Sequence, residues 1–115
     1  MVRKKLLRLL ISLGIGRVDA EVYLYLATTG PKKGMELSKE LNIYKQQIYR
    51  SLKRLQKIGL VKASLERPVF FTANTIEDSL NSFRETKLEE AQFIKEKKGK
   101  LLSRWQSMMK EDSET

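Results

Sequence analysis

The chain has 115 residues, with 23 Lys and Arg against 14 Asp and Glu, which gives a formal net charge of +9. This length suits one modest hydrophobic core, so a separate ligand-sensing domain is not expected. The chain has no His and no Cys, which removes the usual general base, thiol chemistry and most zinc or haem ligand sets. We therefore expect a protein that is not an enzyme, with no catalytic residue, metal site or cofactor. The positive surplus favours a polyanionic partner, either nucleic acid or an anionic membrane.

Leucines recur at helical spacing from Arg3 to Leu13, which predicts an N-terminal helix over residues 1–13. Its basic start is not a secretory signal, because Arg8 interrupts the apolar stretch and no small-residue cleavage site follows. The helix could lie on a membrane surface or pack on the domain or a partner, and the second interpretation is favoured. No apolar run approaches the roughly 20 residues of a membrane-spanning helix. We therefore predict no membrane partner.

Residues 14–74 show the pattern of a winged helix-turn-helix domain. Helical spacing predicts helices over about 17–28, 34–41 and 45–58. Asn42 tolerates positive φ and can make the tight turn between the last two helices, and Gly59 ends the final one. In 60–64 and 69–72 the residue pattern then changes from helical to that of extended strands, which predicts a β-hairpin wing.

From Thr75, a candidate N-cap, the composition is helical to about residue 110. Apolar residues recur mostly at intervals of three, four or seven, as in a coiled-coil seam, although Lys87 and Lys98 interrupt the seam and Gly99 is a candidate kink. Residues 75–111 are thus predicted to form a long dimerisation helix, and residues 112–115 a frayed tail. The predicted fold class is mainly α, with one small hairpin.

The helix over 45–58 should bury Ile48, Leu52 and Leu55 and turn a basic, carboxylate-free face outward. Glutamine can bond adenine and arginine can bond guanine bidentately, whereas lysines suit phosphates. The N-terminal turns of a recognition helix enter the major groove deepest. The expected base readers are Lys45, Gln46, Gln47 and Arg50. The expected phosphate contacts are Lys53, Arg54 and Lys57, with Lys32 and Lys33 before the third helix and Lys62 and Arg67 on the wing.

Tyr49 also lies at the margin of this face. Its phenol could hydrogen-bond a phosphate, or its ring could cover the edge of the core beside Leu52 and Leu24, and the residues alone favour neither. A Lys- and Arg-rich helix face is often simply solvated. Here the preceding turn and the following hairpin favour DNA binding.

The order of residues in 13–73 resembles the helix-turn-helix domain of the TrmB family, archaeal transcriptional regulators whose larger members respond to sugars. The resemblance is carried by Leu13-Gly14-Ile15, Ala20-Glu21-Val22-Tyr23-Leu24, Gly30-Pro31, Glu36-Leu37, Ile43, Ile48-Tyr49-Arg50-Ser51-Leu52, Leu55, Gly59-Leu60-Val61 and Arg67-Pro68. It implies a dimeric winged helix that reads operator DNA with the helix after Ile43. Tyr44 departs from the Pro or Ser common at that position, and the strand over 69–72 is less basic than usual. A sugar-binding region is not seen, so regulation by sugar is not carried over and no small-molecule effector is predicted.

We therefore predict a cytoplasmic, nucleoid-associated transcription regulator that binds an inverted repeat in double-stranded DNA as a homodimer. The alternative is a winged-helix adaptor whose basic face docks an acidic protein within a transcription or other assembly. Counterion release distinguishes the two, because DNA affinity falls steeply with salt.

Overall fold

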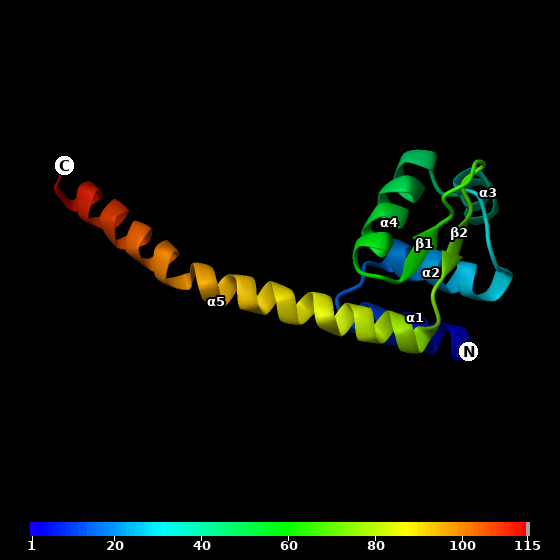
Figure 1. Cartoon of the computed structure of the whole chain (residues 1–115), viewed down its shortest axis with the longest axis horizontal. Helices are drawn as coiled ribbons and strands as arrows, with labels where there is room; N and C mark the ends of the chain where they lie inside the picture. The colour runs from blue at the N-terminus through cyan, green and yellow to red at the C-terminus, as the bar shows by residue number, and fades with distance from the viewer. Residues whose placement is uncertain (115) are drawn as a thin grey trace. The chain divides into compact units, whose positions relative to one another are not determined.

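Helix α2 (Arg17–Thr29) lies at the centre of the N-terminal part of the chain, against α1 (Val2–Ser12), α4 (Lys45–Lys57) and strand β2 (Phe71–Ala73) (Figure 1). The computed structural model describes residues 1–114. Residues 1–83 form one compact unit, and the part of the chain from residue 84 onward forms a second. The remaining elements are α3 (Gly34–Leu41), β1 (Val61–Ala63) and α5 (Ile76–Glu114).

The helices end where the sequence supplies residues that accept positive φ. Asn42 ends α3 in the left-handed region, with φ 55° and ψ 48°, and its amide donates to the Ser38 carbonyl. Gly59 has a φ of 79° after α4, which turns the chain from helix into strand. The turn at Asn42 places α3 beside α4, as the sequence predicted.

The core consists of apolar side chains from the four N-terminal helices and the hairpin. Val22, Leu37, Ile48 and Leu55 are each fully buried. They come from α2, α3 and α4, so the inner face of α4 packs against both preceding helices.

Strands β1 and β2 pair antiparallel in one two-stranded sheet, with Val61 opposite Ala73 and Lys62 opposite Thr72. Lys32, before α3, forms an isolated bridge with Phe71. Its amide and carbonyl both bond the Phe71 backbone, at 3.1 and 2.8 Å. The wing is thereby tied to the segment that leads into the helix-turn-helix. The architecture is the mainly helical winged helix-turn-helix that the sequence predicted.

The first turns of α5 belong to the N-terminal unit through a set of polar contacts. The Tyr23 hydroxyl donates to the Asn74 carbonyl at 2.8 Å, and the buried Ser79 hydroxyl donates to the Tyr23 oxygen at 3.1 Å. The Asn74 amide group donates to the Gly59 carbonyl at 2.9 Å. Thr75 caps the helix by accepting from the Asp78 amide at 3.2 Å, as predicted.

The later part of α5 differs in length from the prediction. The helix continues to Glu114, past the end expected near residue 110, and Gly99 does not interrupt it. The expected frayed tail is therefore helical over 112–114, while 115 lies outside the described residues. Lys110, Glu111 and Asp112 continue the helix without a Gly or Pro to stop it, and the Ser113 hydroxyl bonds the Lys110 carbonyl.

Candidate nucleic-acid interface

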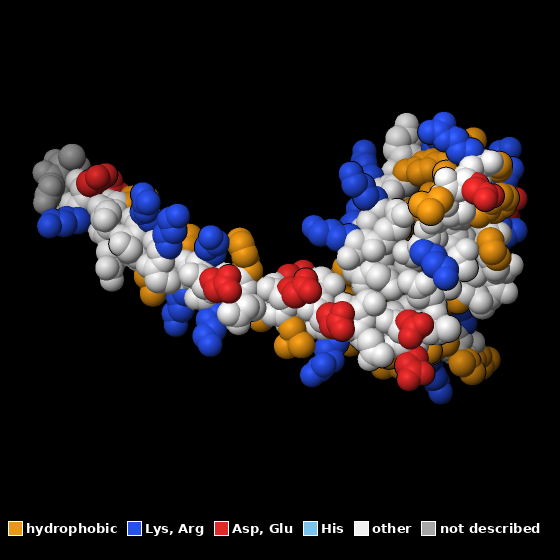
Figure 2. Space-filling view, in the orientation of Figure 1, with side chains coloured by type: hydrophobic (Ala, Val, Ile, Leu, Met, Phe, Trp, Pro, Cys, Tyr) orange, Lys and Arg blue, Asp and Glu red, His pale blue; other side chains and the backbone are white. Residues whose placement is uncertain are grey.

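The outer face of α4 is basic and free of carboxylates. Its sequence KQQIYRSLKRLQK has no Asp or Glu, and Ile48, Ser51, Leu52 and Leu55 are its buried positions. Every predicted DNA-contact residue on this helix is exposed: Lys45, Gln46, Gln47, Tyr49, Arg50, Lys53, Arg54 and Lys57. Figure 2 shows Lys and Arg side chains projecting from the part of the unit where α4 lies.

The turn before α4 is closed by specific hydrogen bonds. The Ile43 amide donates to the Ser38 carbonyl at 3.1 Å, and the Ser38 hydroxyl donates to the Ile43 carbonyl at 2.5 Å. At the other end of α3, the Glu36 carboxylate accepts from the Lys33 amide at 2.9 Å. The two bonds between Ser38 and Ile43 hold the turn from which α4 leaves α3.

Arg54 differs from the other basic residues of α4 because it is engaged within the protein. Its Nε and Nη2 each lie 2.9 Å from a carboxylate oxygen of Asp19, and the Ser51 hydroxyl donates to the same carboxylate at 2.6 Å. The Asp19 side chain is 10% exposed and that of Arg54 56%. Hydrogen bonding to Asp19 raises the pKa of Arg54. The bidentate pair joins α2 to α4, so Arg54 orients the helix.

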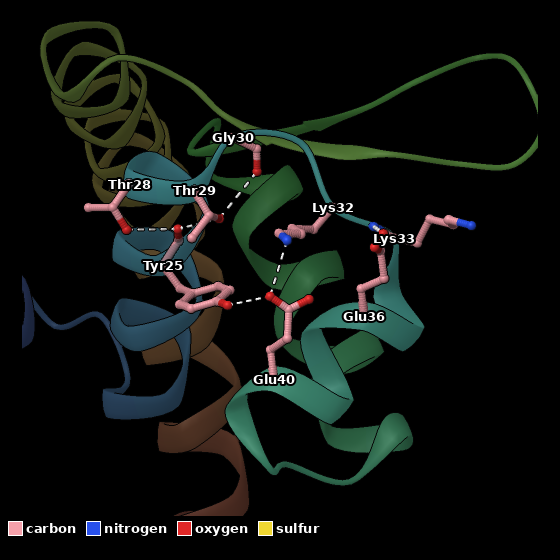
Figure 3. Close-up of polar contacts among 8 residues, drawn as sticks. All are labelled: Tyr25, Thr28, Thr29, Gly30, Lys32, Lys33, Glu36 and Glu40. Carbon is pink, nitrogen blue, oxygen red and sulfur yellow. Dashed lines mark hydrogen bonds and ion pairs between the residues drawn. The ribbon is translucent and has the colours of Figure 1, made fainter.

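Lys32 is also paired, and its neighbour Lys33 points elsewhere. The Lys32 Nζ lies 3.1 Å from Glu40, whose carboxylate also accepts from the Tyr25 hydroxyl. Figure 3 shows Lys32 directed toward Glu40 and Lys33 directed away from this group. The hydrogen bonds from Tyr25 and Lys32 lower the pKa of Glu40, and the bond to Glu40 raises the pKa of Tyr25 and of Lys32. Lys33 is exposed, and its Nζ lies 5.8 Å from the centre of the Phe70 ring.

Tyr49 packs between α3 and the wing. Its ring meets Phe71 edge-on, with centroids 6.3 Å apart. A Cβ at Gly34 would lie 2.4 Å from the Tyr49 Cζ, so a side chain there would displace the ring. The ring covers an edge of the core, beside Phe71 and Gly34, and 40% of the residue stays exposed.

The wing presents Lys62 and Arg67, both exposed, and Leu65 in the hairpin loop is also fully exposed. The predicted DNA-contact residues thus lie on α4, just before α3 and in the hairpin. Two residues of this region were not predicted. Asp19 is a buried carboxylate of α2, and Tyr44 is an 83% exposed aromatic residue at the N-cap of α4.

A second feature is an apolar groove of about 800 Å³ between α1, α2 and the start of α5. Its lining includes Leu6, Leu9, Leu13, Ile76 and Leu80, each at least 42% exposed. No cluster of acidic residues suited to a metal ion is found in the described residues. None of the helices described is long and apolar enough to cross a membrane.

Comparison with known proteins identifies the type of domain. A family model described as "Sugar-specific transcriptional regulator TrmB" matches residues 9–77. No curated protein matches the chain.

Among solved structures, the transcriptional regulator Tm0710 from Thermotoga maritima is similar with a TM-score of 0.58 and 23% identity, over 98% of this chain and 88% of that one. An ArsR-like regulator from Rhodococcus sp. RHA1 has a TM-score of 0.53 and 19% identity, over 90% and 95%. Overoxidised AbfR bound to DNA has a TM-score of 0.52 and 19% identity, over 83% and 76%, and AbfR is a protein of Staphylococcus epidermidis. At these identities the likeness establishes the winged-helix fold.

Proposed function

The chain belongs to the TrmB family of transcriptional regulators, and we propose that it regulates transcription by binding a specific double-stranded DNA sequence as a homodimer. The observation that carries this proposal is the exposed face of α4, which combines Gln and Arg side chains with lysines and has no carboxylate. Transcriptional regulators are not enzymes, and the proposed role needs no chemistry at this face. Binding to chromosomal DNA would associate the protein with the nucleoid in the cytoplasm.

The proposed docking places the first half of α4 in the major groove. Gln46 and Arg50 lie one helical turn apart on the outer face, where both side chains can reach base edges. Lys53 and Lys57 follow toward the end of the helix, where they lie nearer the phosphates. DNA is bound in one of the similar structures, that of overoxidised AbfR, which supports the use of this fold on a duplex.

For Arg54 and Lys32 we propose a different role from the phosphate contact that the sequence favoured. Since Asp19 holds two nitrogens of Arg54 and Glu40 holds Lys32, we assign them to positioning α4 and the segment before α3. The proposed phosphate contacts of each protomer are then Lys33, Lys53, Lys57, Lys62 and Arg67.

The proposal of a homodimer rests on apolar surface that the described residues leave exposed. The groove between α1, α2 and the start of α5 is one such surface. The helix from residue 84 is another, since Ile94, Leu101 and Trp105 are each more than half exposed. Exposed apolar surface of this extent favours association. A two-fold dimer would present two copies of α4, so the bound DNA should be an inverted repeat.

Selection of bound sequences from random duplex DNA, at a fixed salt concentration, tests the proposal. We expect enrichment of an inverted repeat. Arg50→Ala and Gln46→Ala should each relax base preference at one position of the half-site, at a cost of about 1–3 kcal/mol. Lys57→Ala should weaken all sequences alike and reduce the slope of log affinity against log salt by roughly 0.9 per protomer.

Two outcomes would contradict the proposal. Affinity for duplex DNA that shows no sequence preference would rule out specific readout. Binding that is insensitive to salt would instead favour the adaptor function, with an acidic protein on the same face.

A further inference from the structure

We propose that Tyr44 determines part of the DNA specificity by contacting the C5-methyl group of a thymine in each half-site. This inference rests on the proposed function, because it requires α4 to lie in the major groove. It adds a base reader of a different chemistry to the polar residues named above.

The fold itself gives Tyr44 little reason to be aromatic. The residue is 83% exposed, its side chain makes no capping hydrogen bond, and no hydrogen bond of its hydroxyl is found among the described residues. Its carbonyl accepts only the first intrahelical hydrogen bond, from the Ile48 amide at 3.0 Å. Ser, Thr, Asp and Asn are the residues that favour this position. An exposed ring here is therefore better explained by a contact outside the chain.

The position of Tyr44 places its ring at the leading end of α4. It directly precedes Lys45, and its φ of −56° and ψ of 140° are extended. Ile43, the residue before it, is partly buried and packs against the core. This neighbour anchors the backbone from which the ring projects. The leading turn of a recognition helix is the part closest to the base edges.

The surroundings favour a thymine methyl over a phosphate as the partner. A shallow hollow beside the ring is lined by Ser38, Lys39, Asn42, Ile43 and Lys45, so the charged groups there belong to lysines and not to Tyr44. The residues that follow, Lys45, Gln46 and Gln47, are all polar. Tyr44 is thus the one apolar surface in the first turn of the outer face. The thymine methyl is the feature of the major groove that an apolar side chain reads.

The test compares sequence selection by the wild type, Tyr44→Ala and Tyr44→Phe at one salt concentration. We expect Tyr44→Ala to lose a thymine preference at one position per half-site and to keep the rest of the motif. Tyr44→Phe should keep the thymine preference, because the ring and not the hydroxyl makes the contact. Gln56→Ala, another exposed residue of α4, serves as the matched control and should leave the motif unchanged.

The selected duplex is then remade with deoxyuracil at that position, which removes only the methyl group. The affinity of the wild type and of Tyr44→Phe should fall about fourfold per half-site, the value for one buried methyl-sized group. The affinity of Tyr44→Ala should be unaffected by the same change. Circular dichroism of each variant checks that the helices remain folded.

A thymine preference retained by Tyr44→Ala would overturn the inference while leaving specific DNA binding intact. The inference also fails if Tyr44→Phe behaves like Tyr44→Ala and both weaken all sequences alike, since the hydroxyl would then be bonding a phosphate. If the wild type selects no sequence at all, the proposed function and this inference fail together.

Discussion

Replacing Asp19 with alanine should destabilise the protein by about 1–4 kcal/mol, because this side chain is the acceptor for three hydrogen bonds between α2 and α4. The largest part of this cost comes from Ser51. Its hydroxyl is fully buried and would lose its acceptor, which costs about 1–3 kcal/mol. The smaller part comes from Arg54, whose 56% exposed side chain would be rehydrated, so its loss resembles that of a surface pair at roughly 0–1 kcal/mol.

Urea denaturation followed by circular dichroism measures this difference, with all variants at the same protein concentration because the proposed dimerisation would add to the apparent stability. Glu21→Ala is the matched control on the same helix. It breaks the Arg17–Glu21 pair, whose side chains are 74% and 37% exposed, and should cost less than about 0.5 kcal/mol.

A double-mutant cycle separates the ion pair from the buried hydroxyl. Asp19→Ala and Arg54→Ala should together cost less than the sum of the two single changes, with a coupling of at least about 0.5 kcal/mol. If Asp19→Ala shifts the free energy of unfolding no more than Glu21→Ala does, the claim that this carboxylate secures α4 is wrong.

Three further substitutions test other parts of the structure. Glu40→Gln should remove a contribution to the free energy of unfolding. That contribution is present above the unfolded pKa of a glutamate and is lost as the pH falls through the lowered pKa of Glu40. Unfolding midpoints of the wild type and of Glu40→Gln that change identically with pH would refute this. The same change should release Lys32 from its ion pair with Glu40 and raise DNA affinity in filter-binding assays. Loss of a phosphate contact would instead lower that affinity. Gly34→Ala should displace the Tyr49 ring and cost about 1–3 kcal/mol, and a prior Tyr49→Ala change should abolish most of that cost. Leu101→Glu should weaken self-association in sedimentation experiments, whereas unchanged dimerisation would remove α5 from the proposed interface.

Much of the fold could be predicted from the sequence, because residues that tolerate positive φ mark where the helices end. Asn42 and Gly59 adopt the positive φ values that their positions suggested, and the change from helical to alternating period marked the hairpin. The end of α5 was less predictable, since no Gly or Pro marks it. Helical spacing likewise predicted which side of α4 is exposed, because that property depends only on local periodicity.

The pairing of individual cations could not be predicted in this way. Arg54 and Asp19 are 35 positions apart, and they meet only because α2 and α4 pack together. The same holds for Lys32 and Glu40, which are brought together by the turn at the start of α3. The neighbours of Tyr49 were also set by tertiary packing, since its ring meets Phe71 of the wing.

The contacts among Tyr23, Asn74 and Ser79 have a consequence for protein engineering. Because they bind the first turns of α5 to α2 and to the turn after α4, these turns are part of the folded domain on which any C-terminal module must be built. A chimera joined at residue 75 would discard the Ser79 hydroxyl and leave the Tyr23 phenol short of a partner. One joined after Phe83, where the compact unit ends, would retain the whole set. Fusion partners for this domain should therefore be grafted within the helix and not at its start.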